Sequence, residues 1–150
     1  MKKIETSILI HAPIEKVWAT LTNFQEYGNW NPFIKSVKGD PAKGNQIEVF
    51  IQPDQSSQKG ESQKGMIFKP QILENNGKDH FRWKGKLGIK GIFDGEHYFQ
   101  LKEKGEQTEF IHGENFSGLL VGLLWGKIGE STKQGFEAMN QALKHQAEAK

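Results

Sequence analysis

The sequence contains no cysteine, and Arg82 is the sole arginine among its 20 basic residues. The absence of cysteine excludes disulfide frameworks, thiolate metal sites and cysteine nucleophiles. Arginine is the usual bidentate partner of phosphates and of base edges, so its scarcity argues against a nucleic-acid-binding role. We therefore expect no nucleic-acid partner.

Long apolar runs are also missing. The most apolar stretch, residues 118–125, is far too short to span a bilayer. Residues 1–5 carry no apolar signal core and lead directly into a strand-like pattern. These absences predict a cytoplasmic protein without stable membrane insertion, while transient contact with a membrane stays open.

The composition that remains suits one folded domain. The 150 residues are 35% hydrophobic and 25% charged, which is enough to build a core. No internal repeat or composition shift marks a boundary, so residues 1–150 are predicted to form a single domain. Phenylalanine and tryptophan, ten and four in number against two tyrosines, suit a core or the wall of an apolar pocket.

Helical and strand-like spacing alternate along the chain. Pro13 can open a helix over residues 14–21, and a short helical turn is expected before a strand at residues 34–38. Apolar spacing near the C-terminus predicts a firm helix over residues 130–146, preceded by a looser apolar segment that is weakened by glycines. Alternation also predicts strands near residues 4–10 and 47–51.

The dipeptide Asn76-Gly77 is a two-residue hairpin signal. A turn there places apolar residues or glycine on one face of both strands and polar residues on the other. The turn signal and the alternation of apolar residues predict the same hairpin, so each supports the other. The expected pairs are Ile72 with Phe81, Pro70 with Trp83, Phe68 with Gly85 and Met66 with Leu87.

A second hairpin is predicted at Lys104-Gly105. Its inner face is mostly apolar but carries three ionisable groups, and its outer face is expected to be solvated through Asp94, Glu96, Gln100 and Glu109. The expected inner pairs are Leu101 with Thr108, Phe99 with Phe110, His97 with His112, Gly95 with Glu114 and Phe93 with Phe116. The inward glycines, Gly85 and Gly95, remove side-chain volume.

The link between the hairpins must keep both apolar faces on one side of the sheet. A link of odd length does so and places Trp83 beside His97. The interpretation then puts Trp83, His97 and His112 in a row across three strands, with Glu114 diagonal to His97.

The polar cluster of His97, His112 and Glu114 has several readings. It could be a structural network in which buried groups satisfy one another. It could anchor the polar end of a ligand, or act as a general acid and base, because histidine titrates near neutral pH. Two histidines and one carboxylate could also hold a metal, but no helical histidine pair reinforces that reading, and we expect no metal or other cofactor.

Several short motifs together resemble the SRPBCC superfamily, also called START-like, helix-grip or birch-pollen-allergen-like. Within it, the chain resembles the bacterial polyketide cyclase/dehydrase and lipid transport group. The motifs span nearly the whole chain: Ala12-Pro13 with Val17-Trp18, residues 30–33 (WNPF), residues 83–85 (WKG), the alternating strands from His97 to Leu101 and from Thr108 to Phe116, and Gly135-Phe136 with Met139-Asn140 and Leu143.

The resemblance implies an α+β helix-grip fold. In that fold, a seven-stranded curved antiparallel sheet wraps around the long C-terminal helix, and two short helices separate the first two strands. A cavity between sheet and helix would bind a small hydrophobic ligand that is lipid-like, polycyclic or polyketide-like.

Three functions stay open: a carrier or sensor, a cyclase or dehydratase using the polar cluster, and a protein-interaction domain without a ligand. Residues 118–129 could form a gate over the cavity, and the polar loop at residues 53–63 could form part of its rim. The candidate ligand-binding residues are Trp30, Phe33, Trp83, His97, Phe99, Phe110, His112, Glu114, Phe116 and Trp125.

Overall fold

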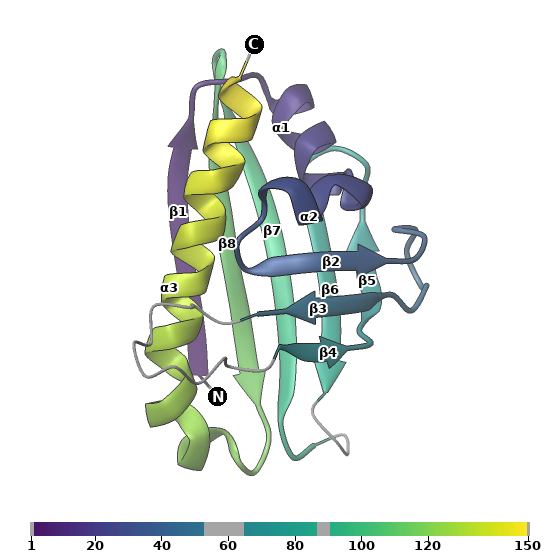
Figure 1. Cartoon of the computed structure of the whole chain (residues 1–150), viewed down its shortest axis with the longest axis vertical. Helices are drawn as coiled ribbons and strands as arrows, with labels where there is room; N and C mark the ends of the chain where they lie inside the picture. The colour runs from purple at the N-terminus through teal and green to yellow at the C-terminus, as the bar shows by residue number, and fades with distance from the viewer. Residues whose placement is uncertain (1, 53–64, 87–90, 150) are drawn as a thin grey trace.

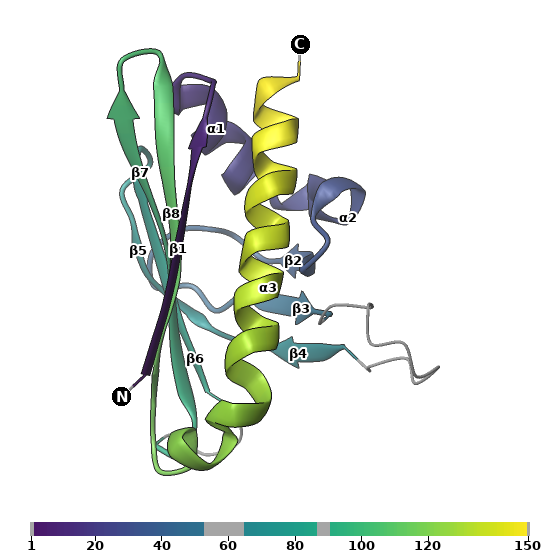
Figure 2. The same cartoon turned by 90° about the vertical axis from the view of Figure 1, so that its left-hand side faces the viewer.

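A five-stranded antiparallel sheet, sheet A, packs one face against the long C-terminal helix (Figures 1 and 2). The computed structural model describes residues 2–52, 65–86 and 91–149. Sheet A has the strand order β1-β8-β7-β6-β5. Its strands are β1 (Lys2–Ile10), β5 (Gln71–Asn75), β6 (His80–Lys86), β7 (Asp94–Lys104) and β8 (Gln107–Ser117), and the helix is α3 (Val121–Glu148).

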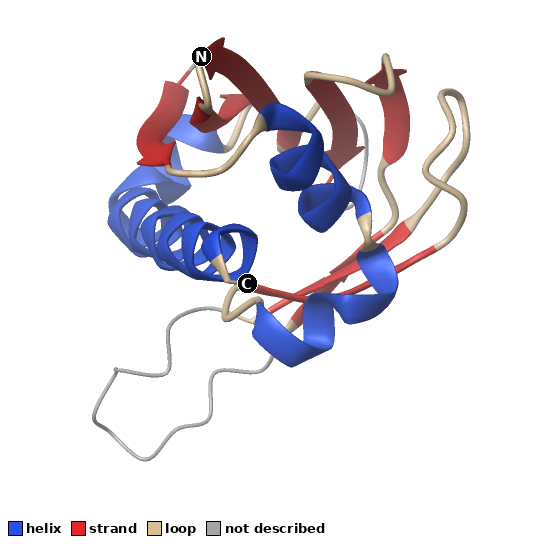
Figure 3. Ribbon diagram, turned by 90° about the horizontal axis from the view of Figure 1, so that it is seen from above, coloured by secondary structure: helices blue, strands red, loops and turns tan. Residues whose placement is uncertain are grey.

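A smaller sheet, sheet B, crosses sheet A at a steep angle, as the view from above shows (Figure 3). Its strands are β2 (Ile34–Lys38), β3 (Glu48–Ile51) and β4 (Met66–Phe68). The predicted α+β architecture is confirmed. The described residues form eight strands rather than seven, because the segment expected as one strand divides at Pro70, which has no N–H to donate to a ladder. Phe68 pairs with Val49 in sheet B, whereas Gln71 pairs with Lys84 in sheet A.

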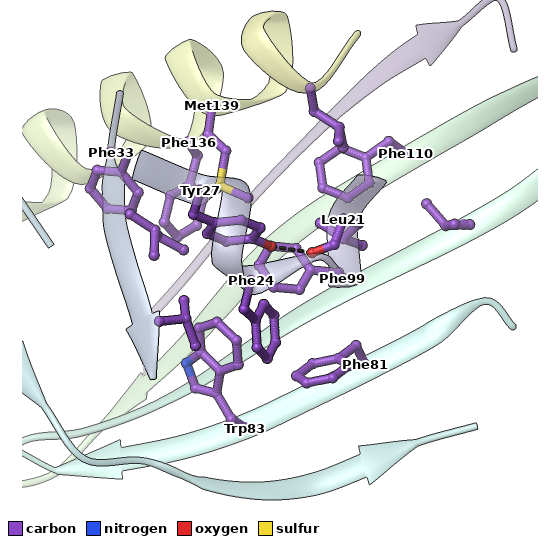
Figure 4. Close-up of a cluster of buried hydrophobic side chains, with 14 of the residues drawn as sticks. Leu21, Phe24, Tyr27, Phe33, Phe81, Trp83, Phe99, Phe110, Phe136 and Met139 are labelled. Carbon is purple, nitrogen blue, oxygen red and sulfur yellow. Dashed lines mark hydrogen bonds between the residues drawn. The ribbon is translucent and has the colours of Figure 1, made fainter. Parts of the chain in front are cut away.

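Short helices connect the two sheets after β1. They are α1 (Ile14–Thr22), the 3₁₀ turn η1 (Phe24–Glu26) and α2 (Tyr27–Trp30). Pro13 opens α1, as predicted, and its carbonyl accepts the N–H groups of Lys16 and Val17 at 3.0 and 3.1 Å. The buried Tyr27 hydroxyl donates to the carbonyl of Leu21 and ties α2 to α1 (Figure 4).

Helix α3 is longer than predicted. It is regular from Val121 onward, so the looser segment expected before residue 130 is helical. Aromatic side chains from the sheets and the short helices gather beneath it around Phe136 and Met139, both fully buried (Figure 4). The ring of Phe136 stacks on His112, with centroids 4.0 Å apart.

The hairpin between β5 and β6 has a different register from the predicted one. Ile72 pairs with Trp83 rather than with Phe81. The turn is wider than two residues because the Asn76 side-chain oxygen accepts the N–H groups of Lys78, Asp79 and His80. The predicted pairs of Pro70 with Trp83 and Phe68 with Gly85 are therefore also wrong, and Leu87 lies outside the described residues.

The hairpin between β7 and β8 turns one residue later than predicted, at Gly105-Glu106. Lys104 consequently pairs with Gln107, and every partner shifts by two residues. An even shift keeps the same side chains on the inner face. The observed pairs are Leu101 with Phe110, Phe99 with His112, His97 with Glu114 and Gly95 with Phe116.

The pairing of Trp83 with His97 is confirmed. The row across three strands is therefore Trp83, His97 and Glu114, while His112 is the residue diagonal to His97. A carboxyl group, rather than a second imidazole, therefore lies directly opposite His97.

The outer face of sheet A is less solvated than predicted. Asp94 is buried, and its carboxylate accepts the N–H of Gly91. Tyr98 lies over Gly113, where a Cβ would come within 2.4 Å of the phenol ring, and its hydroxyl donates to Glu5. Glu96, Gln100 and Glu109 remain partly exposed on this face, as expected.

One pair of substitutions tests which face of α3 supports the fold. Leu143 is fully buried, whereas Leu123 is 77% exposed on the same helix. Leu143→Ala should lower the free energy of unfolding by about 2–5 kcal/mol because it leaves a cavity. Leu123→Ala should change it by less than about 0.5 kcal/mol. Urea denaturation of both variants measures the difference, and equal costs would contradict the packing of α3.

Candidate functional site: a cavity with a buried carboxyl

A cavity of about 200 Å³ lies between sheet A, sheet B and the first half of α3. Its walls are mostly apolar, and its polar lining consists of Lys86, His97, Glu114, Ser131 and Thr132. Apolar pockets with a few converging polar groups are the usual form of small-molecule sites. The other lining residues are Phe33, Val49, Ile51, Met66, Phe68, Pro70, Trp83, Gly85, Phe93, Gly95, Phe116, Leu124 and Ile128.

The candidate residues from the sequence divide into two groups. Phe33, Trp83, His97, Glu114 and Phe116 line the cavity. The others do not, because they pack behind its wall or beside it. Phe99, Phe110 and His112 are buried in the core, Trp30 packs against Tyr27, and Trp125 packs against Phe116.

Glu114 occupies space that Gly95 leaves open. A Cβ on Gly95 would lie 2.2 Å from Oε2 of Glu114, a distance that real Cβ atoms do not adopt. Gly95 is therefore the residue that lets the carboxyl group fit at the cavity wall. The other inward glycine, Gly85, is less tightly packed, because a Cβ there would lie at an ordinary contact distance, 3.5 Å, from Pro70.

A chain of hydrogen bonds runs from Glu114 into the core, and we call it the relay. The Glu114 Oε1 atom lies 3.1 Å from Nδ1 of His97, and Nε2 of His97 lies 2.8 Å from Nε2 of His112. The Nδ1 atom of His112 lies 2.9 Å from Oδ1 of Asn140 in α3. The Asn140 amide donates to Oγ1 of Thr6 at 2.8 Å, and Thr6 donates to the His112 carbonyl at 3.0 Å.

The far end of the relay fixes its direction. The single hydroxyl proton of Thr6 is used on the His112 carbonyl, so Oγ1 must accept from the NH₂ group of Asn140. The amide oxygen of Asn140 then accepts from Nδ1–H of His112. Neutral His112 presents an unprotonated Nε2, which accepts from Nε2–H of His97. Neutral His97 has only a lone pair at Nδ1, so Glu114 donates its carboxyl proton there.

Burial favours the same neutral forms. It raises the pKa of Glu114 to about 8, although 18% of the side chain remains exposed, and it lowers the pKa of His97 to about 3. Burial, followed by the nearness of His97, holds the pKa of His112 well below its usual value. An ion pair between His97 and Glu114 would need the opposite shifts, so this contact is a hydrogen bond from a neutral acid to a neutral imidazole.

Two elements of the relay were missed from the sequence. Asn140 follows Phe136 by four residues on the buried stripe of α3, and a polar residue in an apolar stripe is a signal for a buried partner. Thr6 sits in β1 opposite His112, which only the pairing of β1 with β8 shows.

No group of three or more histidine, aspartate or glutamate side chains within residues 2–52, 65–86 and 91–149 is arranged to hold a metal ion. In the relay, both nitrogens of His97 and both nitrogens of His112 already have hydrogen-bond partners. The hydrogen-bonding capacity of both imidazoles is therefore used within the relay.

The segment proposed as a gate has two faces. Leu124 and Ile128 line the cavity, whereas Leu119 and Leu123 are 87% and 77% exposed. No described helix is both long enough and apolar enough to cross a membrane. Contact of this segment with a membrane stays a prediction, and the loop proposed as a rim, residues 53–63, lies outside the described residues.

The comparisons with known proteins agree with this architecture. Residues 1–148 match the family described as polyketide cyclase / dehydrase and lipid transport. No curated protein matches the sequence.

Solved structures share the fold at low sequence identity. The aromatase/cyclase Zhui from Streptomyces sp. R1128 is 15% identical, with a TM-score of 0.72 over 98% of this chain and 93% of its own. A hypothetical protein from Helicobacter pylori is 12% identical, with a TM-score of 0.77 over 97% and 88%. A protein from Thermus thermophilus is 13% identical, with a TM-score of 0.71 over 97% of both chains.

The neutral state of Glu114 has a consequence for stability. Its pKa rises from 4.5 to about 8 on folding, so its stabilising contribution is complete below about pH 4.5 and is lost as the pH rises through 8. Glu114→Gln has no proton to lose. We expect the wild type to lose on the order of 3 kcal/mol relative to this variant between about pH 5 and pH 9. Urea denaturation across this range measures the difference. The contributions of the two histidines to the pH dependence cancel in this difference, because both proteins contain them. A flat difference would contradict a neutral carboxyl.

The fit of Glu114 beside Gly95 can be tested with an alanine at each inward glycine. Gly95→Ala should cost about 1–3 kcal/mol of unfolding free energy, because its Cβ would displace the carboxyl. Gly85→Ala is the control, since its Cβ meets Pro70 at an ordinary contact distance. Thermal and urea denaturation of the two variants provide the comparison, and equal stability would show that the carboxyl does not need the space at residue 95.

Proposed function

Because this chain belongs to the polyketide cyclase / dehydrase and lipid transport family, we propose that it binds a compact hydrophobic molecule in the cavity between its sheets and α3, as a carrier or sensor. The observation that carries the proposal is the apolar cavity whose wall, among the described residues, holds one carboxyl group, that of Glu114. The Glu114 side chain is 18% exposed, and its Oε2 atom is hydrogen-bonded to no described residue, so the polar group of a ligand can reach it.

The size of the cavity limits the ligand. A volume of about 200 Å³ exceeds the roughly 150 Å³ of engineered cavities that hold benzene and falls below the roughly 300–1,000 Å³ of drug-sized pockets. The part of a ligand that the cavity encloses is therefore one or two rings or a short chain. Trp83, Phe33 and Phe116 offer it aromatic surfaces, and Glu114 offers its polar end a partner.

His97 and His112 support Glu114 in this proposal and do not themselves touch the ligand's polar group. Both nitrogens of each imidazole are engaged within the relay. The ring of His97 also stacks on Trp83, with centroids 5.1 Å apart, which holds the imidazole against β6. The relay thus fixes the position of the carboxyl group at the cavity wall.

A cyclase or dehydratase activity is the second candidate, and one observation favours it. Oε2 of Glu114 faces the cavity as an acceptor, so it could take a proton from a substrate while the proton on Oε1 passes to Nδ1 of His97 and makes that imidazole cationic. Turnover with loss of activity in a folded Glu114→Gln variant would select this candidate over a carrier. Stoichiometric binding without turnover would select the carrier.

Two substitutions on α3 test ligand binding. Ile128→Trp should fill the cavity and weaken the binding of 1-naphthol at least tenfold, because Ile128 lines the cavity. Leu123→Trp is the matched control on the outward face of the same helix and should change affinity less than twofold. Isothermal titration calorimetry measures both, and native mass spectrometry of protein from cells looks for the natural ligand. If the wild type binds no small apolar molecule, or if Ile128→Trp binds as well as the wild type, the proposal fails.

A further inference from the structure

We propose that the cavity selects molecules whose polar group donates a hydrogen bond, alcohols and phenols, over matched molecules that only accept one or carry a carboxylate. The inference rests on the proposed function, since it concerns the same cavity. It follows from the direction of the relay, which determines what Glu114 can offer to a ligand.

The carboxyl proton is committed inside the protein. Thr6 and Asn140 orient both imidazoles so that Nδ1 of His97 must accept, and Glu114 donates its proton there through Oε1. A carboxylic acid has one proton. No donor capacity therefore remains for a ligand.

The second carboxyl oxygen faces the space beside Gly95. Oε2 of Glu114 makes no hydrogen bond to any residue that the structure describes, and it lies where a Cβ of residue 95 would stand. Its lone pairs can only accept. A hydroxyl group that enters the cavity finds an acceptor held in place by strands β7 and β8.

The other polar lining residues stand on β6 and α3, whereas Glu114 stands on β8. Lys86 is exposed, so it lies at the opening rather than in the depth of the cavity. Ser131, on α3, uses its hydroxyl proton on the carbonyl of Ile128 at 3.3 Å. Thr132 is the other hydroxyl of the lining and also belongs to α3. A ligand carbonyl or carboxylate next to Glu114 would lose its hydration without gaining a donor there.

A matched set of ligands tests the inference on the wild-type protein. The probes are 2-naphthol, 2-fluoronaphthalene and 2-naphthoate, which share one ring system and differ in the group that would meet Glu114. We expect 2-naphthol to bind about tenfold more tightly than 2-fluoronaphthalene, as one hydrogen bond to a buried acceptor implies, and 2-naphthoate to bind most weakly. Calorimetric titration at about pH 6.5 keeps Glu114 below its raised pKa.

Two variants at residue 114 test whether the preference comes from the acceptor oxygen that the relay holds at the cavity wall. Glu114→Gln keeps the arrangement, because its NH₂ group can donate to His97 while its oxygen faces the cavity, so the preference for 2-naphthol should persist. Glu114→Met removes the acceptor and should bring the two affinities within twofold of each other. In NMR spectra of labelled histidine, His97 should be neutral with its proton on Nε2, and His112 neutral with its proton on Nδ1.

The outcomes separate the two proposals. If none of the probes binds the wild type, the proposed function fails. If 2-naphthol and 2-fluoronaphthalene bind equally, or 2-naphthoate binds best, ligand binding stands and donor selection is wrong. A doubly protonated His97, or loss of the preference in a folded Glu114→Gln variant, would also overturn the inference.

Discussion

The hydrogen bond from Glu114 to His97 is the interaction on which the site depends. Within the described residues, no arginine or lysine forms an ion pair with the carboxyl group of Glu114, so it is held by remaining neutral and by giving its proton to an imidazole. That solution requires His97 to be neutral as well. The hydrogen bonds of His112, Asn140 and Thr6 must then each run in one direction. One helix and three strands therefore have to bring these donors and acceptors together in a fixed order.

The relay has a cost and a benefit. Each buried polar atom would cost about 1–3 kcal/mol if left without a partner, so the chain of bonds avoids a penalty more than it adds stability. Phe136, Phe99 and Trp83 surround the imidazoles and exclude water from them. In such surroundings, a network that is fully satisfied tolerates little displacement. The cluster is thus enclosed by the core at His112 and Asn140 and open to the cavity at Glu114, so the structural interpretation fits one end of it and the proposed ligand anchor would be the other.

The sequence predicts the fold and the membership of the cluster better than its geometry. Alternation along β7 and β8 depends on each strand alone, so it correctly placed His97, His112 and Glu114 on one face. Their pairing depends on which residue begins the turn, and a turn displaced by one residue exchanged the partners of His97. Asn140 was harder to identify, because its partner lies 28 residues away in another element. Pro70 carried a usable signal, since a proline inside a central strand argues against that strand.

The two sheets contribute different properties to the cavity. Sheet A carries the carboxyl group and its supporting imidazoles, whereas sheet B contributes apolar wall through Val49, Ile51 and Phe68. One isolated bridge, between Gln46 and Gln71, joins the ladders of the two sheets in the described part of the chain. Shape and polarity are therefore encoded in separate stretches of sequence. If the cavity binds ligands as proposed, substitutions in sheet B would reshape the space for a new ligand while its hydrogen-bonding partner, Glu114, stayed the same, which would give one scaffold a route to many ligands of a single chemical kind.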